Sequence, residues 1–167
     1  MIKLLILDVD GVLTDGRKTY DDNGLGCYKV FCDKDFTGIK RLKSSNVDVC
    51  FLSGDENVNR AVAKNRDIDF YYSRGEEKAD YLDMFSEKYN CDKEQMIYVG
   101  DDIFDLEIMK QVGKSYCVNS SPLIIRNQFD SLGDAGDNLI SKLYDIMFGD
   151  EPVLFDKILE LDKRESF

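Results

Sequence analysis

The sequence predicts an α/β fold, a doubly wound parallel sheet, from two observations. Short apolar runs rich in β-branched residues recur along the chain, and segments with helical spacing separate them. Strands that alternate with helices imply right-handed βαβ crossovers, which build a parallel sheet covered by helices on both faces. The expected strands are residues 2–7, 47–52, 68–72, 96–99 and 115–118.

Between these strands, apolar residues spaced three or four positions apart predict helices around residues 36–42, 58–63, 79–85, 103–109 and 139–147. A further amphipathic pattern begins after Asp150, so residues 150–167 are expected to form a helical tail. That tail packs either on its own domain or on a neighbouring subunit. At 167 residues the whole chain, 1–167, has the length of one domain.

Residues 17–31 interrupt the alternation. They hold two short strand-like pieces around Asp22-Asn23-Gly24, which is a turn sequence typical of β-hairpins. This segment follows directly on an acidic loop at the end of the first strand. We therefore expect a hairpin flap over that loop, and a surface hairpin without a role is the alternative.

The composition excludes several classes of function. A net charge of −11 argues against binding to nucleic acid or to anionic membranes, because both require a basic surface. No apolar stretch has membrane-spanning length, and the first residues open a strand rather than a signal peptide. The five cysteines form no Cys-x-x-Cys pair, so we expect no zinc site or disulfide framework, and a reducing, cytoplasmic location. Because the chain has no histidine, polar chemistry must rest on carboxylates, lysines and hydroxyls.

Four polar clusters stand at or just after the ends of predicted strands. In a doubly wound sheet these ends meet at one crevice. Each cluster alone has an ordinary explanation as a turn, a helix cap or an exposed lysine, but together and in this order they favour one active site. The clusters are Asp8 with Asp10, Ser53-Gly54, Lys78, and Asp101-Asp102 with Asp105.

Each cluster has a use if the ligand is a phosphate ester. Asp8 can attack phosphorus and form an aspartyl-phosphate, and Asp10 can protonate the leaving group and then activate water. Mg²⁺ would cancel the repulsion between carboxylate and phosphate, with Asp8, the Asp10 main-chain carbonyl and Asp101 as hard oxygen ligands. Ser53 can donate a hydrogen bond to a phosphoryl oxygen, and Lys78 supplies a compact positive charge.

These residues resemble the four motifs of the haloacid dehalogenase superfamily, which has a Rossmann-like fold. The resemblance covers most of residues 1–120. It is greatest to the small capless phosphatases of 8- or 9-phosphorylated 3-deoxy-ulosonic acids, the octulosonate type and its nine-carbon, sialic-type relatives. The residues that carry it are Asp-Val-Asp-Gly-Val-Leu-Thr-Asp-Gly (8–16), Asp-x-x-Gly-Ile-Lys (35–40), Leu-Ser-Gly (52–54), Lys78 and Gly-Asp-Asp-Ile-Phe-Asp (100–105).

The resemblance implies a role for each matching position. Asp8 would be the nucleophile, Asp10 the acid and base, and Lys78 a phosphate binder together with Ser53-Gly54. Asp101 would ligate Mg²⁺, with Asp102 and Asp105 in support, and the substrate would be a phosphorylated sugar acid.

Members of this family form homotetramers in which a neighbour's hairpin or tail covers each active site. The spacing of the motifs independently leaves no room for a cap domain. Because phosphoryl transfer works best when shielded from water, a partner subunit is the expected lid.

The chain also departs from the family pattern in the elements that face the sugar. The octulosonate type usually has a threonine and an arginine around the glycine of the second motif, where this chain reads Ser53-Gly54-Asp55. It also has a glycine where this chain has Phe36, and its glycine-rich C-terminal stretch is only partly matched here by Gly133 and Gly136. The carbon count of the sugar therefore stays open. Arg74 could hold a substrate carboxylate through a bidentate contact, or lie on the surface.

Two other classes of function remain as alternatives. One is a catalytically silent phosphatase-like module that drives oligomerisation, as in some sialic-acid nucleotide synthetases. Four intact motifs argue against it, since a silent module has no need for clustered like charges. The other is a receiver domain, but such domains carry the phosphorylated aspartate at the end of the third strand, where this chain has Leu52-Ser53.

Overall fold

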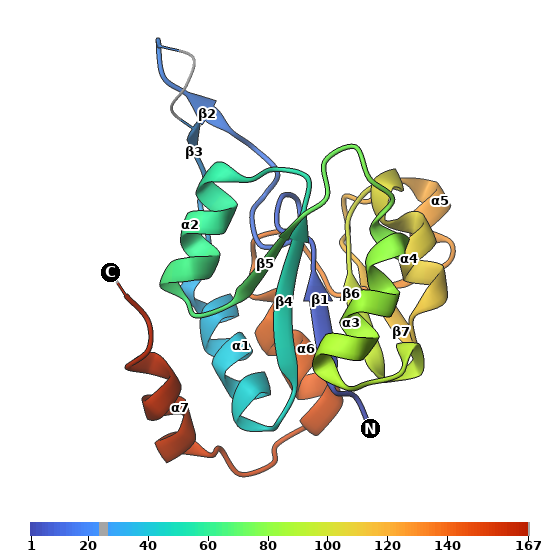
Figure 1. Cartoon of the computed structure of the whole chain (residues 1–167). Helices are drawn as coiled ribbons and strands as arrows, with labels where there is room; N and C mark the ends of the chain where they lie inside the picture. The colour runs from blue at the N-terminus through green and yellow to red at the C-terminus, as the bar shows by residue number, and fades with distance from the viewer. Residues whose placement is uncertain (24–26, 167) are drawn as a thin grey trace.

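A six-stranded parallel sheet runs through the centre of the computed structural model, which describes residues 1–23 and 27–166 (Figure 1). The strand order β5-β4-β1-β6-β7-β8 places β1 in the middle, and the chain winds outward from it in both directions. This is the predicted doubly wound sheet. Its strands are β1 (Leu4–Leu7), β4 (Asp48–Ser53), β5 (Asp69–Tyr72), β6 (Met96–Val99), β7 (Lys114–Cys117) and β8 (Asp130–Ser131).

All five predicted strands are present, and the first is shorter than expected because it begins at Leu4 instead of Ile2. The sixth strand, β8, was not predicted. Its two residues, Asp130 and Ser131, are polar and exposed. They pair with β7 through the backbone, and the Asp130 carboxylate also lies 2.8 Å from Nζ of Lys114. An edge strand of this kind carries no apolar pattern that a sequence could reveal.

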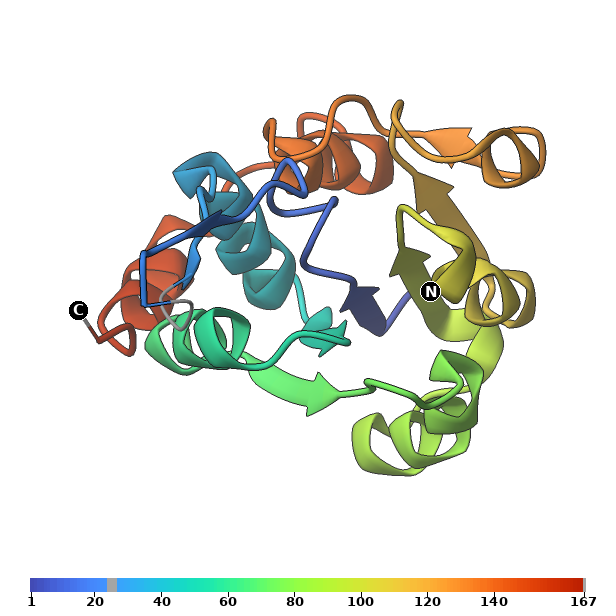
Figure 2. The same cartoon turned by 90° about the horizontal axis from the view of Figure 1, so that it is seen from above.

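Helices cover both faces of the sheet, as Figure 2 shows from above. The α-helices are α1 (Asp33–Ser44), α2 (Asn57–Asn65), α3 (Leu82–Tyr89), α4 (Leu106–Gln111), α5 (Leu123–Arg126), α6 (Leu139–Phe148) and α7 (Phe155–Asp162). Alternate side chains of β1 point to opposite faces, so Leu5 and Leu7 pack with α1 and α6, while Leu4 and Ile6 pack with α3 and α4. Short 3-10 helices occupy Lys78–Tyr81, Lys93–Gln95 and Ile103–Asp105.

The contact between α1 and α6 explains the Asp-x-x-Gly pattern at 35–38. The Asp35 carboxylate is buried and accepts a hydrogen bond of 2.8 Å from the backbone N–H of Ile140, at the start of α6. A Cβ atom on Gly38 would lie 2.6 Å from the backbone nitrogen of Ser141, so only glycine allows the two helices to approach this closely. Phe36, where the family usually has a glycine, is buried in the core on this side of the sheet, and the Arg66 guanidinium lies 4.1 Å from the centre of its ring.

The C-terminal tail packs on its own chain. The Lys40 ammonium lies 3.1 Å from a carboxylate oxygen of Glu165, and Arg66 lies 2.9 Å from the same carboxylate. The backbone N–H of Ser166 donates to the carbonyl of Asn65. Of the two arrangements expected for the tail, the structure therefore shows packing in cis.

The predicted hairpin pairs as an antiparallel two-stranded arm, β2 (Thr19–Tyr20) with β3 (Cys27–Tyr28). Figure 1 shows this arm extending away from the edge at which the parallel strands end. Gly24 of the predicted turn lies outside the described residues, and the role of the arm as a flap stays a prediction. Between β1 and β4 the described chain contains only this arm, α1 and their connections, and no cap domain. Across residues 1–23 and 27–166, no helix combines the length and the apolar character needed to cross a membrane.

Burial of Asp35 makes the stability of the fold depend on pH. Burial raises the pKa of Asp35 to about 6, although the backbone N–H of Ile140 acts in the opposite direction. The folded state therefore holds the carboxyl proton of Asp35 more tightly than the unfolded state does. In the unfolded state the same carboxyl group titrates near a pKa of about 3.9. Stability is lost as the pH rises through this window and the folded protein must ionise a buried carboxyl.

We expect Asp35→Asn, which keeps an oxygen acceptor but cannot ionise, to lose less stability than the wild type between pH 4 and pH 7. The difference should be on the order of 2 kcal/mol. Urea unfolding of both proteins at the two pH values measures it. Equal pH dependence in the two proteins would contradict this explanation.

Candidate active site

The predicted clusters meet at the carboxyl edge of the sheet, around a cavity of about 790 Å³. The register brings this about, because Leu7 at the end of β1 is paired with Phe51 of β4 on one side and with Val99 of β6 on the other. The residues that follow β1 and β6 therefore start at the same level, and Ser53 ends β4 only two positions beyond Phe51. All nine predicted site residues line the cavity: Asp8, Asp10, Ser53, Gly54, Arg74, Lys78, Asp101, Asp102 and Asp105.

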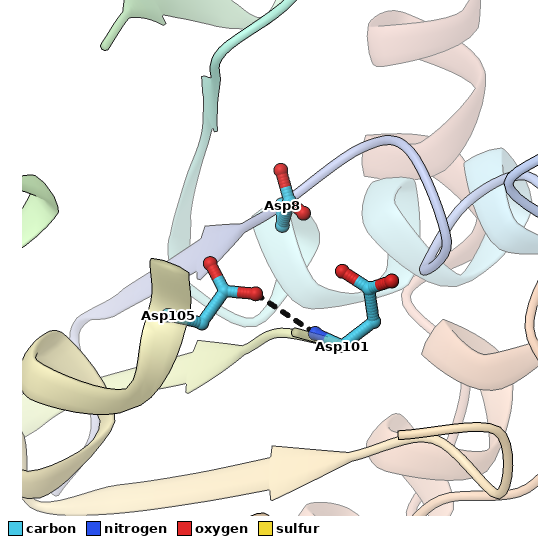
Figure 3. A group of neighbouring side chains, drawn as sticks. All are labelled: Asp8, Asp101 and Asp105. Atoms are coloured by element: carbon cyan, nitrogen blue, oxygen red, sulfur yellow. Dashed lines mark hydrogen bonds between the residues drawn. The ribbon is translucent and has the colours of Figure 1, made fainter. Parts of the chain in front are cut away.

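Three carboxylates form the floor of this cavity. Oxygens of Asp8, Asp101 and Asp105 lie within 4.8 Å of one another, grouped at the ends of β1 and β6 (Figure 3). Burial raises the pKa of Asp8 to about 6, with Lys78 opposing the rise and Asp105 adding to it. Burial also raises the pKa of Asp101 to about 8, and the charges of Asp8 and Asp105 contribute. Such a set of crowded hard oxygens, with too little positive charge beside it, suits a divalent cation.

Both carboxylate oxygens of Asp105 accept hydrogen bonds from other groups of the protein. Its Oδ1 accepts hydrogen bonds of 2.6 Å from Lys78 Nζ and from the hydroxyl of Tyr98. Its Oδ2 accepts the backbone N–H groups of Asp101, at 2.9 Å (the dashed line in Figure 3), and of Asp102, at 3.2 Å. Asp105 thus organises the loop and Lys78, whereas Asp8 and Asp101 are the better placed pair for a metal ion.

Two glycines permit this crowding. At Gly11, whose φ is +84°, an added Cβ would lie 2.0 Å from Oδ2 of Asp101. At Gly100, an added Cβ would lie 2.6 Å from the carboxylate of Asp105. A side chain at either position would displace an acidic group of the site.

Lys78 is buried, unlike the exposed helix lysine that its position alone would predict. Its Nζ lies 3.2 Å from Oδ1 of Asp8 and 2.6 Å from Oδ1 of Asp105. Burial disfavours the charged ammonium, but the two carboxylates outweigh it and hold the pKa of Lys78 above its usual value. The lysine therefore stays protonated and offers positive charge beside Asp8.

Asp10 has different neighbours from Asp8, although only one residue separates them. Its Oδ1 lies 2.7 Å from Nζ of Lys29, which follows β3 in the hairpin arm. Its Oδ2 accepts a hydrogen bond of 2.9 Å from the side-chain amide of Asn59, on α2. The Asp10 carboxylate is thus held between the arm and α2.

Ser53 ends β4, and its Oγ accepts hydrogen bonds from the side chain of Asn59 (3.0 Å) and from the backbone N–H of Asp55 (3.2 Å). Among the described residues no acceptor is recorded for its hydroxyl proton, which remains available to a ligand. The Asp55 carboxylate pairs with Lys18 at 2.6 Å and with Lys29 at 2.9 Å. Burial alone would raise the pKa of Asp55, but hydrogen bonds from these two lysines lower it to about 2.

Arg74 and Asp102 lie at the rim. Arg74 is exposed, and within the described part of the chain its guanidinium has no recorded hydrogen bond or ion pair. Asp102 is also exposed and accepts a hydrogen bond of 2.7 Å from the backbone N–H of Ile103, so it caps the 3-10 helix at Ile103–Asp105.

Three residues at the site were not identified from the sequence: Lys29, Asn59 and Tyr98. None of them directly follows a strand of the parallel sheet, which is the position that marks the other site residues. Tyr98 could have been noticed, because β6 reads Met-Ile-Tyr-Val and the Tyr98 hydroxyl is its one strongly polar side-chain group. Lys29 lies between Tyr28 and Val30, in the pattern of an ordinary exposed strand residue, and Asn59 lies in a polar stretch where nothing in the local pattern distinguishes it.

Comparison with known proteins places the chain in a family. A family profile described as haloacid dehalogenase-like hydrolase matches residues 54–134. The chain is 35% identical over 131 residues to the 3-deoxy-D-manno-octulosonate 8-phosphate phosphatase of Haemophilus influenzae, covering 77% of this chain and 72% of that protein. It is also 35% identical over 127 residues to the enzyme of the same name from Salmonella typhi, covering 74% of this chain and 66% of that protein.

Solved structures agree with this assignment. The cobalt-bound deoxy-D-mannose-octulosonate 8-phosphate phosphatase of Haemophilus influenzae superimposes with a TM-score of 0.85 at 28% identity, covering 99% of this chain and 98% of that one. The 3-deoxy-D-manno-octulosonate 8-phosphate phosphatase of Yersinia pestis gives a TM-score of 0.79 at 26% identity, covering 98% and 83%. The chain belongs to the haloacid dehalogenase-like hydrolases, and its enzyme class is that of the phosphoric monoester hydrolases.

Proposed function

We propose that the protein is a Mg²⁺-dependent phosphatase that removes the terminal phosphate, at position 8 or 9, from an acidic 3-deoxy-ulosonic sugar. The reaction passes through an aspartyl-phosphate on Asp8. The observation that carries the proposal is the buried carboxylate of Asp8, which lies beside Lys78 and Asp101 in a cavity that also holds Ser53. The sugar acid in the names of the similar phosphatases supports the substrate class.

The donor set fits a magnesium ion. Asp8 and Asp101 present carboxylate oxygens whose mutual repulsion is left without a full counter-charge, and Mg²⁺ prefers such oxygens. Asp8, the Asp10 main-chain carbonyl and Asp101 would hold the ion, with Asp102 and Asp105 in support. When bound, it supplies positive charge that lets a carboxylate and a phosphate approach each other.

The protein's own groups carry the transfer in two steps. Lys78 and the Ser53-Gly54 turn bind the phosphoryl oxygens. Asp8 attacks phosphorus, its new O–P bond forms as the bond to the sugar oxygen breaks, and the proton of Asp10 passes to that oxygen. Asp10 then takes a proton from water as the water oxygen attacks phosphorus. The bond to Asp8 breaks, inorganic phosphate leaves, and both carboxyl groups return to their starting states.

The proposal extends to the assembly and the location of the protein. The chain acts as one domain, 1–167, in a cytoplasmic homotetramer whose neighbouring subunits cover the active sites. Support comes from the hairpin arm, where Tyr20, Tyr28 and Val30 are 63%, 69% and 80% exposed. Large side chains exposed together on a projecting arm are typical of a protein–protein contact. The five cysteines, all unpaired, agree with a reducing compartment.

Asp8→Asn should lower Mg²⁺-dependent phosphate release more than about 1,000-fold, because the amide has the same shape but cannot attack phosphorus. Phosphate release from a panel of eight- and nine-carbon ulosonic acid phosphates measures the effect. Asp83→Asn is the matched control, since its carboxylate lies on α3, is exposed and pairs only with Lys93 among the described residues. Full activity of Asp8→Asn would refute the proposed nucleophile.

Asp101→Asn should remove the stabilisation that Mg²⁺ gives to the wild type. Mg²⁺ at 100 times its dissociation constant should raise the unfolding free energy of the wild type by about 2.7 kcal/mol. Without the metal, the variant should be at least as stable as the wild type, because the substitution relieves the repulsion between the carboxylates of Asp8 and Asp101. Thermal melts with and without Mg²⁺ measure both effects, and equal metal responses in the two proteins would exclude Asp101 as a ligand.

Arg74→Met should lower kcat/KM about 10-fold or more for the ulosonic acid phosphates, through the loss of a charged hydrogen bond to the substrate carboxylate. It should leave the kcat/KM for p-nitrophenyl phosphate, which has no carboxylate, nearly unchanged. Specificity constants of both proteins on both substrates test this. A parallel loss on the two substrates would argue against carboxylate recognition by Arg74.

A further inference from the structure

Lys29 connects the hairpin arm to the active site through a buried ammonium group. Its side chain is 0% exposed, and Nζ donates hydrogen bonds to Oδ2 of Asp10 at 3.0 Å, to Oδ2 of Asp55 at 2.9 Å and to Oδ1 of Asn59 at 2.9 Å. An ammonium group has three N–H donors, and these three acceptors engage all of them. Lys29 therefore has no donor left for a substrate and acts on other protein groups.

Asn59 completes the enclosure of Asp10. It is fully buried, accepts from Lys29 through Oδ1, and donates through Nδ2 to Oδ2 of Asp10 at 2.9 Å. The same amide nitrogen lies 3.0 Å from Oγ of Ser53. Lys29 and Asn59 thus both donate to Oδ2 of Asp10, whereas Oδ1 lies 2.7 Å from the Lys29 ammonium but accepts no recorded hydrogen bond among the described residues. Because the terminal torsion of an aspartate is otherwise broad, these contacts are what fix the plane of the carboxylate.

Asp55 keeps Lys29 in place. Its Oδ2 contacts both Lys29 and Lys18, so two lysines and two aspartates, Asp10 and Asp55, form one charge-balanced group. A buried lysine without such partners would be strongly unfavourable. Octulosonate-type relatives usually have an arginine at the position of Asp55. In this chain Asp55 instead holds the Lys29 ammonium in place.

We propose that Lys29, together with Asn59, is a positioning residue that holds the Asp10 carboxylate in the orientation needed to pass its proton to the leaving oxygen. The inference rests on the proposed function and deepens it. It also gives the hairpin arm a part in the chemistry, because the base of the arm supplies the contact that orients the acid.

The dependence of the rate on the leaving group tests this role. A sugar alkoxide is strongly basic and needs a proton as it leaves, whereas p-nitrophenolate is a stable anion that needs little help. The two probes are 3-deoxy-D-manno-octulosonate 8-phosphate and p-nitrophenyl phosphate, each followed as release of the alcohol or phenol in a single turnover.

We expect Lys29→Met to slow single-turnover release from the sugar phosphate about 100-fold, as a small displacement of a catalytic group does. Release of p-nitrophenol should slow much less, and the substrate concentration at half-maximal rate should stay the same for both probes, because Lys29 has no donor free for substrate. This change in the ratio of the two rates is a readout that a general loss of structure would not give.

Lys18→Met is the matched control. It removes a lysine from the same carboxylate, Asp55, but Lys18 has no recorded hydrogen bond or ion pair to Asp10 among the described residues. The ratio of the two rates should therefore stay at its wild-type value. If Lys29→Met fails to fold, as judged by circular dichroism, the double variant Lys29→Met/Asp55→Asn removes both partners of the buried pair and should show the same change in ratio.

Equal slowing of both probes, no slowing of either, or the same change in ratio in Lys18→Met would overturn the positioning role while leaving the proposed phosphatase intact. Failure of the wild type to release phosphate from either probe would instead overturn the proposed function, and this inference with it.

Discussion

The repulsion between two crowded carboxylates, the buried Asp8 and the half-buried Asp101, is the constraint on which the rest of the site depends. The sheet places them side by side because β1 and β6 are neighbours and end in register. Burial strengthens their repulsion, since little water is present to screen it. Lys78 contributes one positive charge, and Asp105 with Tyr98 holds that lysine in place. The negative charge that Lys78 leaves uncompensated gives the site a strong preference for a divalent cation.

A second feature is the separation of two carboxylates that the chain places only two positions apart. Asp8 lies at the edge of the sheet beside Lys78, whereas Asp10 lies beyond it, against Lys29. Each carboxylate thus has its own lysine and its own surroundings, and different surroundings allow two like groups to do different work. The proposed division into nucleophile and proton carrier follows from this separation. In a chain without histidine, no imidazole is available to take the second role.

Much of this arrangement could be predicted from the sequence, and the reason is topological. The carboxyl ends of parallel strands share one edge, so polar residues after Leu7, Leu52 and Val99 had to meet once the sheet was parallel. The strand β8 and the short helix α5 were missed because two or four residues carry no detectable period. Lys29 and Asn59 were missed for another reason. Their contacts with Asp10 depend on how the arm returns to the sheet and on which face α2 turns inward.

By itself, the sequence determined the fold class, the edge of the sheet that bears the chemistry and the residues that line it, because local periodicity and strand order are sufficient for those conclusions. Only the tertiary structure decided that Lys78 is buried, that Lys29 contacts Asp10, and that the tail lies against α1 of its own chain. Each of these is a contact between segments 19 or more residues apart. Such contacts depend on the packing of whole helices and strands, which no local pattern specifies.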